Sequence, residues 1–276
     1  MPEGDDVHRL ARRLHASLAG QVLTMTDFRV PALAGADLAG QRVDGVAARG
    51  KHLLLRTDGG LTVHSHLKMD GRWRLYRPGE RWREPDHEVR AVLATDRAVA
   101  VGTLLGILEV WPTKEEPQRL GHLGPDVLGP DWDPDEALRR LTADPSRPVG
   151  EAVLDQRVMA GPGNVYRSEA CFLRGLDPRT PVGTVRDPAA LVALMKRLME
   201  ANRTRPVRVT TGDTRPGRNL WVYGRAGRPC RRCGTAIERI TLGDAPEERV
   251  AFLCPSCQPP SPGPFEPPPR FVSGPP

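Results

Sequence analysis

The sequence has few lysines, few aromatic residues and no long apolar run, and the last of these absences excludes a membrane-spanning protein. Only four of its 40 basic residues are lysines, and aromatic side chains make up 5% of the chain. The longest apolar stretch, residues 98–110, is interrupted by glycines and a threonine, so it is too short to cross a bilayer. The first ten residues are acidic and contain neither a basic nor an apolar leader region. We therefore expect a soluble, cytoplasmic protein with no membrane partner.

The composition excludes several other classes of protein. Apolar residues make up 39% and charged residues 27% of the chain, which provides enough apolar side chains for a buried core. Such a composition is not that of a wholly disordered chain, and the sequence has no collagen-like repeat. A length of 276 residues is typical of about two domains.

The basic charge is concentrated in the second half of the chain. Residues 1–146 carry 20 basic and 22 acidic side chains, whereas residues 147–258 carry 19 basic and 11 acidic ones. A coding bias toward arginine can explain the scarcity of lysine, but it does not explain why acidic residues become rare in one half. A basic half joined to a neutral half is typical of a protein that binds nucleic acid.

The N-terminal region predicts one helix followed by an antiparallel β-sandwich. Apolar residues at positions 7, 10, 11, 14 and 18 share one helix face, acidic residues occupy its first turn, and Gly20 ends it. Short apolar runs punctuated by glycine follow, and we expect strands at residues 22–26, 42–49, 52–57, 61–66, 72–76, 89–93, 98–101 and 105–110. Strands so close together favour an antiparallel sandwich or barrel, of which we predict the sandwich.

The C-terminal half predicts helices, a hairpin and a tail. Asp133 followed by Pro134 is typical of a helix start, and further helices are expected at residues 149–158, 164–173 and 188–201. A basic loop follows at residues 203–218, and the last 18 residues contain nine prolines, so we expect them to be disordered. We therefore predict an α+β fold with a sandwich domain at residues 1–115, a linker at 116–133, a helical domain at 134–220, a cysteine-rich ribbon at 221–258 and a tail at 259–276.

Four of the five cysteines have the spacing of a metal site. Cys230 and Cys233 form one pair, and Cys254 and Cys257 form a second pair after 20 intervening residues. Two such pairs can place four thiolates in a tetrahedral shell around Zn²⁺, and the flanking segments 237–242 and 250–253 are typical of a hairpin. Disulfides are the alternative, but they are rare in cytosolic proteins. The sequence therefore predicts one structural zinc ion, with no open coordination position for chemistry.

Four segments, in order along the chain, carry a family resemblance. They are Met1-Pro2-Glu3-Gly4, Arg49-Gly50-Lys51-His52, Gly161-Pro162-Gly163-Asn164-Val165-Tyr166, and the ending from Val222-Tyr223-Gly224-Arg225 to Cys254-Pro255-Ser256-Cys257-Gln258. Together they resemble the Fpg/Nei family of DNA glycosylase/AP lyases, with its catalytic N-terminus, strand lysine, helix–two-turn–helix motif and zinc finger. The resemblance implies that the helical domain and the ribbon bind damaged DNA, that no redox or nucleotide cofactor is needed, and that the enzyme is a monomer.

The resemblance implies catalytic roles for Pro2, Glu3 and Lys51. Once Met1 is removed, the secondary amine of Pro2 can attack C1′ and form an iminium ion, an electron sink that permits elimination at C2′–C3′. Glu3 would protonate the sugar ring oxygen or shuttle protons, and Lys51 would donate a proton or contact a phosphate. The structural alternatives are a helix-starting proline, a helix-capping acid and a solvated lysine. Asp6 stands where the family often has glutamate, so a catalytic role for it stays open.

The resemblance also implies DNA contacts for three residues. Asn164 lies in a glycine-rich turn where its amide and the following N–H groups can bind a phosphate. Pro162 stands where the family more often has an aliphatic residue, and it removes one N–H group from that turn. Arg249 matches the arginine on the family's finger hairpin, which contacts the backbone of an extruded nucleotide. Met69 resembles a loop residue that fills the space left by the flipped base.

Three other candidate residues receive structural interpretations. Cys171 lies in a helical stretch beside apolar residues, and we interpret it as a buried small side chain. His64 and His66 share one face of a strand without an evident third ligand, so we interpret them as structural.

The loop before the Val-Tyr-Gly-Arg run favours one branch of the family. It reaches Val222 from residues 210–213 in few residues, which resembles the endonuclease VIII (Nei) branch rather than the longer loop of the purine-specific members. We therefore predict a bifunctional glycosylase/AP lyase of base excision repair that favours oxidised pyrimidines and cuts by β,δ-elimination. The alternatives are the same chemistry on oxidised purines, a non-catalytic DNA-binding zinc protein of this fold, and a plain zinc-ribbon transcription factor.

Overall fold

The expected N-terminal helix is present as α1 (Gly4–Leu18), in a computed structural model that describes residues 2–243 and 248–260. Its start is held by a carboxylate, because Asp6 Oδ2 accepts the N–H of Glu3 at 3.1 Å. Val7, Leu14 and Leu18 of its apolar face are buried. From residue 261 onward, the Pro-rich tail lies outside the described residues.

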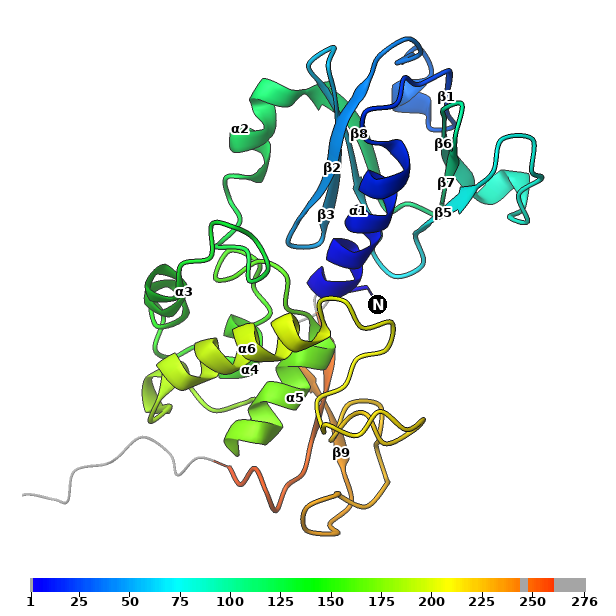
Figure 1. The fold of residues 1–276 in the computed structure, drawn as a ribbon. Helices are drawn as coiled ribbons and strands as arrows, with labels where there is room; N and C mark the ends of the chain where they lie inside the picture. The colour runs from blue at the N-terminus through cyan, green and yellow to red at the C-terminus, as the bar shows by residue number, and fades with distance from the viewer. Residues whose placement is uncertain (1, 244–247, 261–276) are drawn as a thin grey trace, which may run out of the picture.

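Two four-stranded antiparallel sheets form the N-terminal domain, as expected (Figure 1). One sheet has the order β1 (Met25–Phe28), β6 (Val89–Ala94), β7 (Val99–Thr103) and β5 (Arg72–Tyr76). The other has the order β2 (Val43–Arg49), β3 (His52–Thr57), β4 (Leu61–His66) and β8 (Ile107–Pro112). Side chains from both sheets and from α1 share one core, in which Leu14, Leu53 and Leu93 are buried. Burial of this shared apolar surface stabilises the sandwich.

The strand expected at residues 22–26 begins later, as β1 at Met25, and Val22 before it forms only an isolated bridge. Val22 pairs with Arg42 alone, and the N–H of Leu23 donates to the carbonyl of Gln41 at 2.8 Å. These bonds hold the segment against the start of β2, and the chain then crosses to the other sheet, where Met25 pairs with Ala94. Apolar alternation alone does not show at which residue a chain changes sheets.

A helical domain follows the sandwich and has a second apolar core. Its helices are α3 (Pro134–Leu141), α4 (Val149–Ala152), α5 (Asn164–Arg174) and α6 (Pro188–Asn202). Asp133 caps α3 as expected, since its carboxylate accepts the N–H groups of Asp135 and Glu136. The expected linker contains a short helix, α2 (Glu116–Leu120), and single 3₁₀ turns lie at Pro31–Leu33, Asp86–Glu88, Thr113–Glu115 and Val182–Thr184. No described helix is long and apolar enough to span a membrane.

The helix expected at residues 149–158 is shorter in the structure, where α4 ends at Ala152. Asp155 then accepts the N–H of Arg157 and binds the guanidinium groups of Arg147 and Arg157. An aspartate that binds the backbone two residues on favours a turn over a helix. The turn leads the chain to Ala160, which forms a bridge with Asp126 near the junction of the two domains.

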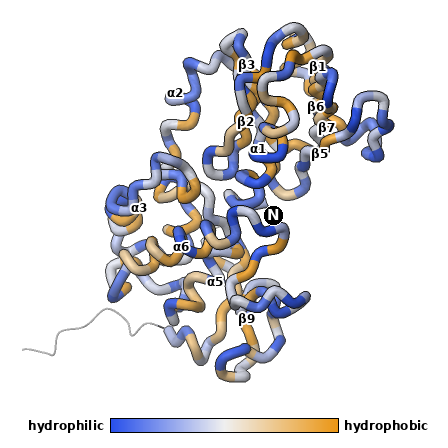
Figure 2. The backbone as a smooth tube through the Cα atoms, in the orientation of Figure 1, coloured by the Kyte–Doolittle hydropathy of each residue, from blue (hydrophilic) through white to orange (hydrophobic). Residues whose placement is uncertain are grey.

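The cysteine-rich region forms the expected hairpin beside α5. Strands β9 (Glu238–Leu242) and β10 (Arg249–Leu253) pair antiparallel, and Ile237 and Cys254 pack against Phe172 of α5. Figure 1 shows the two domains joined where the N-terminus of α1 meets the helical domain. In Figure 2 the loop that projects beyond β5 and β7 is hydrophilic, whereas α6 is mostly hydrophobic.

Candidate active site and metal centre

The N-terminus of α1 is fixed to the turn that precedes α5. The N–H of Gly4 donates to the carbonyl of Gly161 at 2.9 Å, and Pro2 lies half-buried beside this contact. A Cβ at position 4 would approach Gly161 Cα to 2.8 Å, so only glycine fits without a shift. The first residues of the chain therefore lie at the junction of the two domains.

Glu3 is fully buried, and its carboxylate lies at the N-terminus of α5. Oε2 accepts the N–H of Gly163 at 2.9 Å, and Oε1 accepts the N–H of Val165 at 2.8 Å. These N–H groups are the positive end of a helix and favour the carboxylate. Burial nevertheless raises the pKa of Glu3 above its usual value, although the charges of Arg208 and Lys51 act against that rise. A carboxyl group with a raised pKa suits proton transfer near neutral pH.

Lys51 lies in the tight turn between β2 and β3, which is held against the helical domain. Gly50 has a φ of +56° and donates its N–H to Asp126 Oδ2 at 2.8 Å. Burial, together with the positive charges of Arg208 and Arg249, lowers the pKa of Lys51 to about 8, although the negative charge of Glu3 acts against the change. The charges of Glu3, Arg208 and Arg249 come from three different parts of the chain, and all of them act on Lys51.

Two residues at this site were missed by the sequence analysis. Asp126 is buried and holds the Lys51 turn, and Arg208 places its guanidinium against Asp5 and Asp6 in the first turn of α1. Asp126 follows a Gly-Pro pair in the expected linker, and Arg208 is one arginine among many in a basic loop. Neither position carries a local signal that distinguishes it from a surface residue. Asp6 accepts the N–H of Glu3 and binds Arg208, so in this structure its carboxylate caps the start of α1.

Asn164 is the first residue of α5 and connects that helix to the hairpin. Its Nδ2 donates to the carbonyl of Val250 at 2.6 Å, and its Oδ1 accepts a hydrogen bond from Arg167. Arg249, the neighbour of Val250 and the first residue of β10, is exposed, and its guanidinium donates to the carbonyl of Glu248. The contact of α5 with β10 thus places Arg249 near enough to affect the pKa of Lys51.

Met69 lies on the loop between β4 and β5 and is 64% exposed, which is unusual for a large apolar side chain. Lys68 beside it has a φ of +53°, and Leu104 in the adjacent β7–β8 loop has a φ of +47°. These are the two non-glycine residues with positive φ among the described residues. Strained backbone of this kind is often found at functional loops.

The histidines of the second sheet form a hydrogen-bonded cluster that includes His52. His64 Nε2 lies 2.8 Å from His52 Nδ1, and His64 Nδ1 lies 2.9 Å from Glu109 Oε2. Burial lowers the pKa of His52 to about 3 and that of His66 to about 4. Because an imidazole with so low a pKa is neutral at pH 7, these two rings add no charge beside Lys51.

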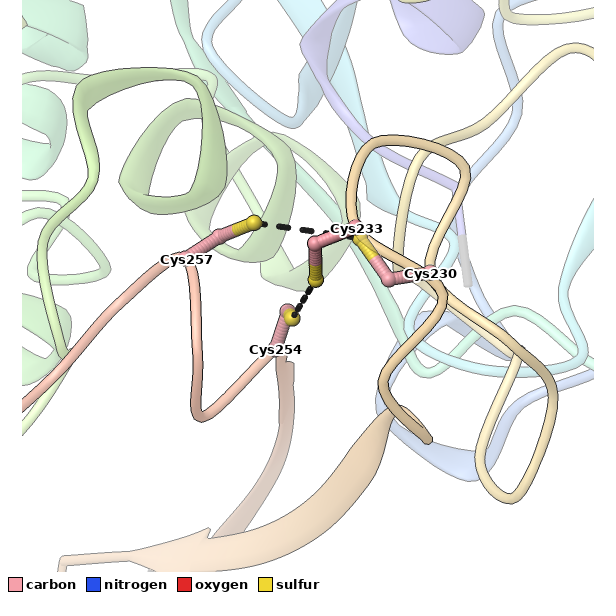
Figure 3. Close-up of side chains that lie close together, drawn as sticks. All are labelled: Cys230, Cys233, Cys254 and Cys257. Atoms are coloured by element: carbon pink, nitrogen blue, oxygen red, sulfur yellow. Dashed lines mark hydrogen bonds between the residues drawn. The ribbon is translucent and has the colours of Figure 1, made fainter.

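The four cysteines predicted as ligands converge (Figure 3), and they form the one group of possible metal ligands among the described residues. Their Sγ atoms lie within 4.8 Å of one another, with Cys233 to Cys254 at 3.4 Å and Cys230 to Cys257 at 4.0 Å. Four sulfur donors at such distances fit a tetrahedral metal shell. Cys171 lies apart, fully buried in α5, where burial raises its pKa to about 12.

Most of the chain matches one protein family in comparisons of its sequence with known proteins. Residues 1–103 match the family model of the formamidopyrimidine-DNA glycosylase N-terminal domain, and residues 123–203 match the model of the formamidopyrimidine-DNA glycosylase H2TH domain. The chain is 57% identical to a probable endonuclease 8 2 of Streptomyces coelicolor, covering 94% of both chains. It is 52% identical to the DNA-(apurinic or apyrimidinic site) lyase Nei2 of Mycolicibacterium smegmatis, covering 94% of this chain and 99% of the relative.

A solved structure shares the fold at low sequence identity. The Lactococcus lactis Fpg in complex with DNA that contains an abasic site aligns with a TM-score of 0.77 at 22% identity, covering 93% of this chain and 99% of that one. The likeness extends over both domains and supports the α+β architecture expected from the sequence.

Proposed function

The chain belongs to the Fpg/Nei family of DNA glycosylases and AP lyases, and from that premise we propose that it excises oxidised bases from DNA and then cuts the strand. The observation that carries this proposal is the placement of the Glu3 carboxylate, next to the N-terminal Pro2, on two N–H groups of α5. The short loop before Val222, which resembles that of the Nei branch, favours oxidised pyrimidines as substrates.

The chemistry requires a free amine at Pro2. After removal of Met1, the nitrogen of Pro2 attacks C1′ of the damaged nucleoside, and the glycosidic bond breaks as the base leaves with the electron pair and takes up a proton. C1′ still carries the ring oxygen at this point, so the Pro2 nitrogen loses its proton and its lone pair forms the iminium as the C1′–O4′ bond breaks and O4′ takes up a proton. The iminium makes the C2′ hydrogen acidic, and its loss as a proton expels the 3′ phosphate. A second elimination, with loss of the C4′ proton, expels the 5′ phosphate. Glu3 donates a proton to the sugar ring oxygen, and Lys51 donates a proton or holds a phosphate during elimination.

The helical domain and the hairpin supply the DNA contacts in this proposal. Asn164 uses one hydrogen of its amino group on Val250, so the second hydrogen remains for a phosphate. Arg249 binds the backbone beside the extruded nucleotide, and Met69 fills the space that the base leaves. The proposed parts are a catalytic domain at residues 1–115, a linker at 116–133, a helix–two-turn–helix domain at 134–220 and a zinc finger at 221–258.

The metal of the proposed finger is zinc, held by Cys230, Cys233, Cys254 and Cys257. Four thiolates in a closed shell suit Zn²⁺ in a structural role, and the ion supplies folding energy to the hairpin without taking part in catalysis. We further propose that the enzyme acts as a monomer in the cytoplasm and needs no nucleotide cofactor.

Borohydride trapping tests the proposed function directly. The untagged protein is mixed with DNA that contains an abasic site or thymine glycol, and borohydride reduces the iminium to a stable covalent adduct. A Pro2→Gly variant replaces the secondary amine with a primary one, whose imine can lose a proton and become neutral, so we expect about tenfold less adduct. The control retains an N-terminal tag, which converts the amine to an amide and prevents adduct formation. Absence of an adduct with the untagged, zinc-loaded protein would favour the non-catalytic DNA-binding alternative.

Arg249→Ala is expected to reduce excision of a damaged base about 10-fold, the effect of losing one charge-assisted phosphate contact of about 1.4 kcal/mol. An abasic site needs no extrusion of a base, so its cleavage should fall much less. Single-turnover rates on thymine glycol and abasic DNA measure the difference. Arg239→Ala, which removes an arginine from the paired strand β9, is the control for lost charge alone. Equal losses on both substrates would contradict a role of Arg249 in base extrusion.

A further inference from the structure

Arg208 connects the loop after α6 to the first turn of α1. Its Nε donates to Asp5 Oδ2 at 2.8 Å, its Nη2 donates to Asp5 Oδ1 at 2.7 Å, and Nη2 also binds Asp6. Asp5 is fully buried, and the Arg208 side chain is 15% exposed. The guanidinium lies over the ring of Tyr166, 5.5 Å from its centroid. The two-pronged geometry orients the carboxylate of Asp5 in a way that a single contact could not.

The contact extends from Arg208 to the backbone of the catalytic residues. Asp6 Oδ2, which Arg208 binds, also accepts the N–H of Glu3 at 3.1 Å. Glu3 directly follows Pro2, and Asp5 lies three residues after Pro2. Arg208 therefore restrains the segment that carries both the amine and the carboxylate of the proposed reaction.

The backbone around Arg208 is itself anchored to the helical domain. Its carbonyl accepts a hydrogen bond from Asn219 Nδ2 at 2.8 Å, and the N–H of Val209 donates to Asn202 Oδ1 at 2.7 Å. Thr210 binds the buried carboxylate of Glu169 in α5. Because the loop is fixed on both sides of Arg208, the guanidinium can hold α1 in place relative to α5 and α6.

The Nε and Nη2 donors of Arg208 already have protein partners, and in this the residue differs from the exposed arginines of the same loop. The side chain of Arg215, for example, is 68% exposed and donates to Asp213 in the same loop. Nε and Nη2 of Arg208 are taken up by Asp5 and Asp6. These contacts place Arg208 in the protein framework of the site rather than among the groups available for DNA phosphates.

We propose that Arg208 is a positioning residue for base excision: it fixes the first turn of α1 so that the Pro2 amine and the Glu3 carboxylate face the same sugar. The inference rests on the proposed function, since it assumes that Pro2 and Glu3 act on that sugar. A small displacement of reacting groups can cost about 10²-fold in rate. We therefore expect Arg208→Gln to lower the single-turnover excision rate by about 30- to 100-fold while the dissociation constant for DNA changes less than about threefold.

Arg208→Lys separates the charge of Arg208 from its geometry. Lysine keeps a positive charge but cannot bind both oxygens of Asp5 in the planar geometry of a guanidinium. We expect about a tenfold loss of rate in this variant, between the wild type and Arg208→Gln. Arg215→Gln removes a charge from the same loop without a contact to α1, and its excision rate at saturating DNA should match the wild type.

The pH profile of the single-turnover rate gives a readout that a purely structural role would not change. The charges facing Glu3 are Arg208, Lys51 and Asp5, and those facing Lys51 are Glu3, Arg208 and Arg249. The charge of Arg208 lowers the pKa of both Glu3 and Lys51, so its removal raises both. Glu3 and Lys51 both act as proton donors, so the alkaline limb, where they lose those protons, should move to higher pH in Arg208→Gln and stay in place in Arg208→Lys.

A double variant keeps the proposal testable if Arg208→Gln is unstable. Loss of Arg208 leaves the buried carboxylate of Asp5 without its cation, and an unpaired buried charge lowers the stability of the folded protein. Asp5→Asn combined with Arg208→Gln removes that carboxylate, and we expect the melting temperature to recover while the excision rate stays low. Recovery of the rate together with stability would overturn the proposal, as would a wild-type rate in Arg208→Gln. Failure of the wild-type protein to form a trapped adduct would instead contradict the proposed function itself.

Discussion

Glu3→Gln is expected to lower the rate of base excision by about 10²- to 10⁴-fold, the range for removal of a general acid–base group. Strand cleavage at a preformed abasic site should fall far less, because an abasic sugar exists partly as an open-chain aldehyde and needs no protonation of its ring oxygen. Single-turnover rates on thymine glycol and abasic DNA of the same sequence measure both steps. Separation of the two rates would identify Glu3 as the acid for ring opening.

The contacts of Glu3 also predict a loss of stability in this variant. The carboxylate accepts one N–H with each oxygen, whereas the glutamine amide has one oxygen and an NH₂ group. Either Gly163 or Val165 would therefore face a donor, at a cost of about 1–3 kcal/mol in the free energy of unfolding. Glu115→Gln, which changes a half-buried carboxylate paired with Arg119 far from the site, is the control and should leave both rates unchanged. If Glu3→Gln lowered both rates equally at temperatures where it is folded, the separate role in excision would be wrong.

The parts of the fold that were predictable from sequence are those with a local physical cause. The periodic apolar face of α1, the Asp133 cap of α3 and the paired cysteines each depend on residues close together in the chain. The start of the strand expected at residues 22–26 and the end of the helix expected at 149–158 were misplaced for another reason. In both places backbone or side-chain hydrogen bonds override a pattern that apolar periodicity alone suggests.

The candidate site was predictable only where a residue belongs to a recognisable motif. The sequence identified Glu3 and Lys51 but contained no sign that Asp126 holds the Lys51 turn or that Arg208 holds α1. The contact of Asp126 with Gly50 spans 76 positions of the chain, and the contact of Arg208 with Asp5 spans 203 positions. Asn164 was expected to bind a phosphate, and that remains a prediction. Its bond to Val250 became visible only once α5 and β10 were placed side by side.

Cys254→Ser is expected to remove the metal and to unfold the hairpin. Structural zinc sites contribute binding free energies of about 10–16 kcal/mol, and a serine hydroxyl is a poor substitute for a thiolate. The hairpin presents Arg249 and accepts hydrogen bonds from Asn164 and Arg167 at the carbonyl of Val250. We therefore expect zinc content to fall from one ion per chain to near zero and DNA affinity to fall at least about tenfold, measured by elemental analysis and by titration of labelled DNA.

The N-terminal sandwich should survive this substitution, because its core is built from α1 and the two sheets and contains no residue of the hairpin. Proteolysis should then remove the region around β9 and β10 first and leave the N-terminal domain intact. Cys171→Ser is the control, since Cys171 is fully buried in α5 but lies outside the cysteine cluster. This variant should lose some stability through a buried hydroxyl and keep its zinc. Full DNA affinity in a zinc-free Cys254→Ser protein would contradict the role of the hairpin, because Arg249 would then bind DNA without the structure that places it.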